Sequence, residues 1–150
     1  SLKISSDLER IGDYAANVAK RASALSQVEP MRPMAVIPRM SQIVQGMIKD
    51  VLDAYMARDA DKALAVWRRD EEVDETYNSL FRELLTYMME DPRQIGSNTH
   101  LIFMAKNLER IGDHATNIAE SVYYIVTGEH LSAYRPKEDK THKIVDTTDE

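Results

Sequence analysis

The chain has 150 residues, of which 43% are hydrophobic, and a formal net charge of −6. This length supports about one ordinary core, and the acidic balance argues against a nucleic-acid-binding protein, which would need a basic stripe to meet the phosphates. The sequence has no cysteine and no run of about 18 apolar residues, which excludes disulfides and thiolate metal sites and predicts no membrane span. We therefore expect a soluble, cytoplasmic protein.

The first expected helix runs from the start of the chain to about Ala24. Its apolar residues recur at steps of three and four, the period of a helix that buries one face. These residues are Leu8, Ile11, Ala15, Val18 and Ala22. Pro30, Pro33 and Pro38 then predict a stiff linker over residues 29–38, because proline and the residue before it resist helix formation.

Three further helices are expected after the linker. The second begins near Pro38, and the third follows an N-cap at Asp59 or Asp61. Asp91 and Pro92 predict the N-cap and first residue of the fourth helix. The positions expected to face the core are Met40, Val44, Met47, Val51 and Tyr55, then Ala63, Val66, Asp70, Val73, Tyr77, Leu80 and Leu84, then Leu101, Ala105, Leu108, Ile111, Ala115, Ile118 and Val122.

A segment of the first helix returns in the fourth. Residues 7–20 and 107–120 are identical at nine of fourteen positions, and both contain Leu-Glu-Arg-Ile-Gly-Asp. Self-similarity at a fixed offset indicates a duplicated structural unit. If a unit has three helices and the motif lies on the third, residues 39–130 form a complete unit. Residues 1–28 would then be the last helix of an earlier unit, and the chain would be truncated at its N-terminus.

The remainder of the chain is predicted to be a tail. Gly128 is a natural end for the fourth helix. Residues 131–150 are mostly charged and polar, so we expect them to form a C-terminal tail outside the core.

Pairs of carboxylates four residues apart recur along these helices. Such a pair lies on one helix face, where like charges repel by roughly 0.2–0.5 kcal/mol, so a retained pair suggests a nearby cation. Asp70 also occupies a position where the helical period predicts a hydrophobic residue. If the third and fourth helices pack together, their carboxylates converge in an oxygen-only site suited to Mg²⁺, Mn²⁺, Ca²⁺ or iron. The pairs are Glu9/Asp13, Asp70/Asp74 and Glu109/Asp113.

The repeated motif also places a glycine inside each of two expected helices. The glycines of the motif, Gly12 and Gly112, each cost about 1 kcal/mol inside a helix, and we expect them to permit close helix approach.

The alternative to a metal site is neutralisation of the carboxylates by ordinary surface ion pairs. The arginines available for this are Arg10, Arg68, Arg69 and Arg110.

The paired motif carries a family resemblance. Two copies of Leu-Glu-Arg-Ile-Gly-Asp-x-Ala-x-Asn-[Val/Ile]-Ala, with Asp70-Glu-Glu-Val-Asp74 before the second copy, closely resemble the PhoU family of phosphate-regulon and phosphate-transport regulators. The resemblance covers roughly residues 1–130. It implies an all-α fold in which a complete PhoU-like three-helix bundle is joined by the third helix of a truncated first repeat.

The resemblance also implies a function. PhoU proteins are cytoplasmic adaptors between a phosphate ABC transporter ATPase and a phosphate-sensing histidine kinase, and they act as negative regulators without catalysing a reaction. They carry multinuclear metal clusters at Glu/Asp-x-x-x-Asp motifs, so the expected cofactor is a divalent or trivalent ion such as iron, Mn, Mg or Zn. Carried onto this sequence, the metal residues are Asp70, Asp74, Glu109 and Asp113 in one cluster, with Glu9 and Asp13 in a half-site.

Two other classes of function remain open at this point. A metal-free helical scaffold that binds partner proteins would explain everything except the repeated acidic pairs. A ferritin-like carboxylate enzyme is less favoured, because the sequence contains no Glu-x-x-His. We also expect a homodimer, since the apolar stripe of the first helix would otherwise be exposed. That helix would pair with its counterpart in a two-fold dimer or swap onto a neighbouring bundle, and the stiff linker would favour this by holding it away from its own bundle.

Overall fold

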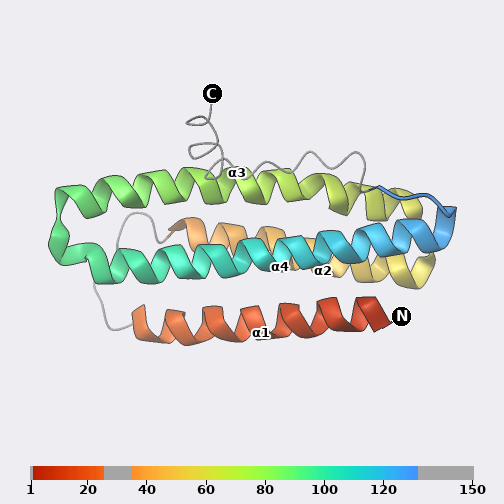
Figure 1. The fold of residues 1–150 in the computed structure, drawn as a ribbon, viewed down its shortest axis with the longest axis horizontal. Helices are drawn as coiled ribbons and strands as arrows, with labels where there is room; N and C mark the ends of the chain where they lie inside the picture. Colours follow the sequence, from red (N-terminus) through yellow and green to blue (C-terminus); the bar gives the residue numbers. More distant parts are fainter. Residues whose placement is uncertain (1, 26–34, 132–150) are drawn as a thin grey trace, which may run out of the picture.

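The computed structural model describes residues 2–25 and 35–131, and these residues form an all-α fold without a strand (Figure 1). The predicted fold class is therefore confirmed. The four helices are α1 (Leu2–Leu25), α2 (Val36–Ala57), α3 (Ala60–Glu90) and α4 (Ile95–Thr127). Within the described ranges, no helix combines the length and apolarity needed to cross a bilayer.

Helix α4 lies at the centre of the molecule. Helices α2, α3 and α4 run alternately in opposite directions and form a three-helix bundle, while α1 lies along the other side of α4 and antiparallel to it (Figure 1). Helix α4 therefore packs against each of the other three helices.

The turn between α2 and α3 consists of two residues. Arg58 ends α2 in the left-handed conformation, with φ 52° and ψ 45°, and its N–H group points to the carbonyls of Ala54 and Tyr55. Asp59 then accepts a hydrogen bond from the Lys62 N–H at 3.0 Å. Of the two predicted N-caps for α3, Asp59 is the one used, and this satisfies a backbone donor that the helix itself leaves unpaired.

The predicted start of the fourth helix is shifted by one short turn. Asp91 caps a 3₁₀ turn, Pro92–Gln94, by accepting a hydrogen bond from the Arg93 N–H at 3.1 Å, and α4 begins at Ile95. The Arg93 guanidinium also donates to the Asp91 carboxylate at 3.0 Å and lowers the pKa of that carboxyl below its usual value. Gly128 ends α4 with φ 76°, as predicted from glycine's tolerance of this conformation.

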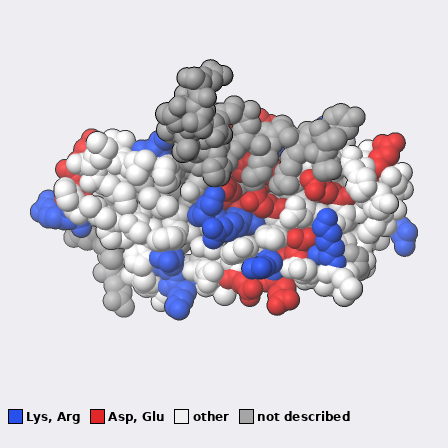
Figure 2. Space-filling model, viewed as in Figure 1, with Lys and Arg blue, Asp and Glu red and all other residues white. Residues whose placement is uncertain are grey.

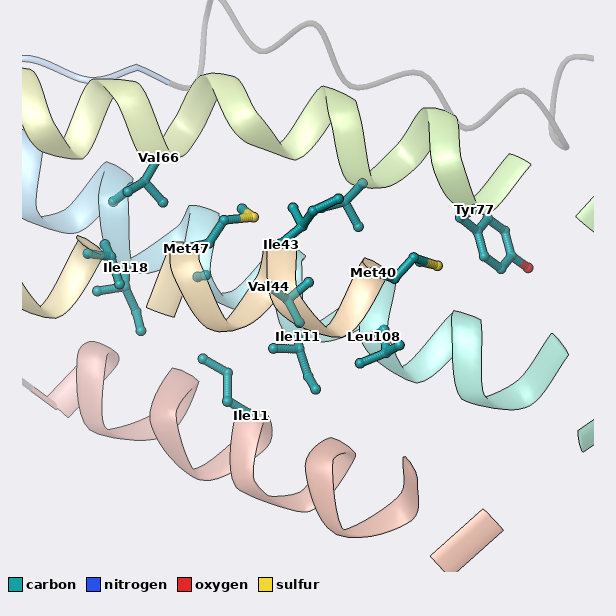
Figure 3. Close-up of a cluster of buried hydrophobic side chains, with 14 of the residues drawn as sticks. Ile11, Met40, Ile43, Val44, Met47, Val66, Tyr77, Leu108, Ile111 and Ile118 are labelled. Carbon is teal, nitrogen blue, oxygen red and sulfur yellow. The ribbon is translucent and has the colours of Figure 1, made fainter. Parts of the chain in front are cut away.

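The hydrophobic core lies between α2, α3 and α4. Every residue of the predicted stripes in α3 and α4 is buried, and so is each of those in α2 except Tyr55, which is 39% exposed at the end of the helix. Figure 3 shows labelled side chains from these helices meeting in the core, together with Ile11 of α1. The period of the sequence therefore identified the correct faces of the bundle helices.

The predicted face of α1 is only partly buried. Ile11 is buried and Val18 is partly buried, but Leu8, Ala15 and Ala22 are exposed. The reason is that α1 contacts mainly one helix, α4, which covers a narrow stripe. The buried residues of α1 are Ile4, Asp7, Ile11 and Leu25.

Helix α1 lies against α4 of its own chain, whereas the sequence led us to expect it to be held away by the linker. Most of that linker, residues 29–34, and residues 132–150 of the predicted tail lie outside the described residues. The last three linker positions belong to α2. Pro38 fits there because it lies in the first turn, where no backbone N–H donor is needed.

Candidate metal centre

Three carboxylates meet where α3 crosses α4. Asp70 and Asp74 lie one turn apart on the face of α3 that packs against α4, and they are 3% and 5% exposed. Asp113 reaches the same place from α4 and is half-buried. One carboxylate oxygen from each of the three lies within 4.8 Å of the other two. The structure therefore brings together three of the six predicted metal residues.

Gly112 explains why α4 can approach α3 so closely. A Cβ atom at this position would lie 3.4 Å from Asp70 Oδ1 and 3.5 Å from Val73 Cγ1, so the glycine leaves just enough space for the carboxylate. The predicted role in close helix approach is confirmed for Gly112. It is wrong for Gly12, because a Cβ atom there would meet no atom of the described chain within 4 Å.

Glu109 is buried beside this group but is directed elsewhere. It is 4% exposed, and its Oε1 accepts a hydrogen bond from Lys106 Nζ at 2.7 Å. The same ammonium group lies 5.0 Å from the centre of the Tyr77 ring. In this arrangement a lysine balances the charge of Glu109, which is not part of the group of three carboxylates.

The remaining two predicted residues are not near the carboxylate group. Glu9 and Asp13 are exposed on α1, because the helix packs against α4 through another face. No described helix covers that side of α1, so this acidic pair meets no second pair.

Two of the four arginines considered as alternative partners have contacts elsewhere. Arg69 forms an ion pair with Asp50 of α2 at 3.8 Å, and Arg110 lies 5.7 Å from the centre of the Tyr14 ring. Both arginines therefore have a position defined by residues outside the carboxylate group.

The arrangement has a clear chemical consequence. Three ionised carboxylates within 4.8 Å of one another would repel, and burial increases this repulsion because Coulomb energies grow as the effective dielectric constant falls. Oxygen-only ligand sets of this kind fit hard or borderline cations, which offset that repulsion. The residues present therefore fit a metal ion.

One partly buried polar pair was missed by the sequence analysis. His114 Nδ1 lies 2.7 Å from Asp7 Oδ1, which joins α4 to α1, and Tyr14 stacks on the His114 ring with centroids 5.7 Å apart. The repeat contained a signal for this contact. Asp7 replaces Asn107, and His114 replaces Tyr14, at two of the few positions where the two copies of the motif differ.

Comparisons with known proteins identify relatives over nearly the whole chain. The model of the PhoU domain matches residues 37–122. A phosphate-specific transport system accessory protein PhoU homolog from Caulobacter vibrioides is 60% identical over 140 residues, which covers 93% of this chain and 61% of the relative. The corresponding protein of Rhizobium meliloti is 50% identical and covers 99% of this chain and 63% of the relative.

Solved structures give the same result. The crystal structure of PhoU from Pseudomonas aeruginosa superposes with a TM-score of 0.82 at 48% identity, covering 85% of this chain and 61% of that one. The phosphate transport system regulatory protein PhoU of Streptococcus pneumoniae gives a TM-score of 0.75 at 32% identity, covering 84% and 59%. The chain thus spans about three fifths of the length of the relatives it matches.

Proposed function

The chain belongs to the PhoU family, and from this premise we propose that it acts as a cytoplasmic regulatory adaptor of phosphate transport. Its partners would be the ATPase of a phosphate ABC transporter and a phosphate-sensing histidine kinase, and it would act on them as a negative regulator. The observation that carries this proposal is the close match to proteins named for the phosphate-specific transport system. We further propose that the protein works by binding and catalyses no reaction of its own.

A metal ion is part of this proposal. Asp70, Asp74 and Asp113 would hold a divalent or trivalent cation between α3 and α4, and Glu109 would join them when the metal ion takes over the charge balance from Lys106. The metal would supply positive charge at a buried helix crossing and would join the two helices there. Glu9 and Asp13 would contribute a ligand pair only where a further helix covers them.

The metal part of the proposal is tested by thermal unfolding of the metal-stripped chain with added Mg²⁺, Mn²⁺, Ca²⁺, Zn²⁺ or Fe²⁺. A ligand present at 100 times its Kd raises the free energy of unfolding by about 2.7 kcal/mol, so at least one ion should raise Tm by several degrees. Inductively coupled plasma analysis of the purified chain identifies the ion that it retains. A chain that retains no metal and whose Tm responds to none of these ions would be a metal-free scaffold.

The adaptor function is tested by measuring binding to each partner. Immobilised chain should capture the purified transporter ATPase and the cytoplasmic part of the histidine kinase in a saturable manner. Phosphatase and nucleotidase assays on the same preparation should give no turnover that follows the protein through purification. Failure to bind either partner, or turnover that is lost with Asp74→Asn, would contradict the proposal.

A further inference from the structure

The groove between α1 and α4 contains a cavity of about 510 Å³ that lies apart from the carboxylate group. Asn17, Lys20 and Arg21 line it from α1, and His100, Phe103 and Arg110 line it from α4. No carboxylate is among its described lining residues, although the chain as a whole carries a net charge of −6. The groove therefore concentrates positive charge on an acidic protein. Figure 2 shows lysine and arginine side chains in several patches on this face, with aspartate and glutamate patches between them.

Arg21 is held in place by two groups of α4. Its Nη1 lies 3.2 Å from His100 Nδ1, and its guanidinium carbon lies 4.1 Å from the centre of the Phe103 ring. Because arginine can only donate, His100 accepts this hydrogen bond at Nδ1, and its Nε2 then carries the proton. Stacking on a ring holds the guanidinium plane and leaves the donors on its edge available to a ligand.

The second arginine is positioned in a similar way. The guanidinium of Arg110 lies 5.7 Å from the centre of the Tyr14 ring, across the same α1–α4 seam. Lys20 adds a third cation from the exposed side of the groove. Two planar guanidinium groups and an ammonium group are the side chains that bind phosphate oxygens through charge-assisted hydrogen bonds.

We propose that this α1–α4 groove binds a phosphate group, either as inorganic phosphate or on a small phosphorylated molecule. Arg21 and Arg110 would donate to the phosphate oxygens, and Lys20 would add charge. A cavity of about 510 Å³ is within the range that holds a small organic ligand, so there is room for more than the phosphate itself. This site goes beyond the adaptor function and is independent of the metal centre.

The test is isothermal titration of the metal-stripped chain, in the presence of EDTA, with inorganic phosphate, pyrophosphate and ATP in separate experiments. We expect saturable binding of at least one of the three. Similar affinity for all three would identify the free ion as a sufficient ligand, whereas binding of ATP alone would identify a phosphate group on a larger molecule. The absence of saturable binding up to about 10 mM of every probe, beyond the range of weak specific affinities, would overturn the proposal.

Variants locate the binding. Arg21→Gln and Arg110→Gln should each weaken binding by about tenfold or more, since each removes charge-assisted hydrogen bonds. Arg21→Lys should weaken binding less than Arg21→Gln, because it keeps the positive charge. It should still bind more weakly than the unmodified chain, because lysine lacks the planar pair of donors. Arg10→Gln is the matched control: it removes the same charge from an exposed position of α1 that does not line the cavity, and it should leave binding unchanged.

A second measurement does not depend on the variants folding. Addition of the phosphate probe to the unmodified chain should shift the backbone NMR signals of residues 17–21 and 100–110. Shifts confined to residues around Asp74 and Asp113, or equal loss of affinity in Arg10→Gln and Arg21→Gln, would overturn the assignment. Asp74→Asn should abolish metal binding but leave phosphate binding intact, which separates failure of this proposal from failure of the metal proposal.

Discussion

Two copies of one motif have different environments in this molecule. The copy at residues 108–119 lies at the centre of the fold, where its glycine fits against Asp70 and its aspartate meets two more from α3. Leu8–Ala19 lies on α1, where the equivalent glycine has open space beside it and the equivalent carboxylates are exposed. Nearly the same residues thus build a candidate metal site in one copy and a solvated helix face in the other.

The difference comes from the helix that each copy meets. The second copy packs against α3, which supplies Asp70 and Asp74, and the first copy packs against α4 through a different face. A spacing of four residues places two carboxylates on one side of a helix, but it does not supply the remaining ligands. The site therefore depends on the tertiary contact as well as on the motif.

The largest expected difference between the copies concerns metal binding. Asp74→Asn with Asp113→Asn should abolish it, because two of the three charged ligands lose their negative charge while keeping their shape. The matched control is Glu9→Gln with Asp13→Asn, which removes two charges from the exposed copy and should leave binding unchanged. Calorimetric titration with the best-binding ion measures both. Equal loss of metal binding in the two double variants would mean that the two copies of the motif do not differ in metal binding, contrary to the structure.

The second prediction uses the two glycines. Gly112→Leu should lower the free energy of unfolding by about 1–3 kcal/mol or more, because the added side chain must displace Asp70 and Val73 at a packed helix crossing. Gly12→Leu should raise it by up to about 1 kcal/mol, since leucine favours the helix and meets no neighbouring atom. Urea unfolding gives both values. Two changes of the same sign would contradict the proposed difference in packing.

The third prediction concerns the contact that joins the copies. Asp7→Asn places in the first copy the residue found in the second, and it removes the charge that faces His114. We expect the free energy of unfolding to fall by about 1 kcal/mol. The loss is smaller than for a fully buried pair because the His114 side chain is 23% exposed. A double-mutant cycle with His114→Gln measures the coupling. A coupling energy near zero would mean that the two side chains contribute independently.

The smallest expected effect is a change in metal affinity when Lys106 is replaced. Its counterpart in the first copy is Ser6, so only Glu109 has a lysine three residues before it. Lys106→Met removes a positive charge beside the carboxylate group, which should tighten metal binding roughly three- to tenfold. Calorimetric titration checks the direction, and Lys20→Met, far along the α1–α4 groove, is the control. Weaker binding in Lys106→Met would mean that the lysine supports the site.

The sequence predicted the bundle well because periodicity reports burial directly. The stripes of α3 and α4 were correct at every position, including Asp70, whose unexpected place in an apolar stripe was the best signal of the site. The N-cap at Asp59 and the end at Gly128 followed from local chemistry. These features depend on residues close together in the chain.

Features that depend on how distant helices dock were not predictable in the same way. The prediction of the buried face of α1 was wrong in part, because the apolar stripe could not show that a single helix would cover it. The Asp7–His114 contact and the turning of Glu109 toward Lys106 depend on the register and rotation of the packed helices. Charge and spacing alone gave four candidate ligands around α3 and α4, and the docking selects three of them.

The central position of α4 has a consequence for how the protein is made. Helix α4 is the last of the four helices to leave the ribosome, yet α1, the first, has its main contacts with it. At a synthesis rate of about 5–20 residues per second, α1 waits several seconds for its partner, while α2 and α3 can already form a local hairpin. During that interval the face of α1 that carries Ile4 and Ile11 lacks its contacts with α4, so the packing of α1 on the bundle can be completed only after α4 has been synthesised.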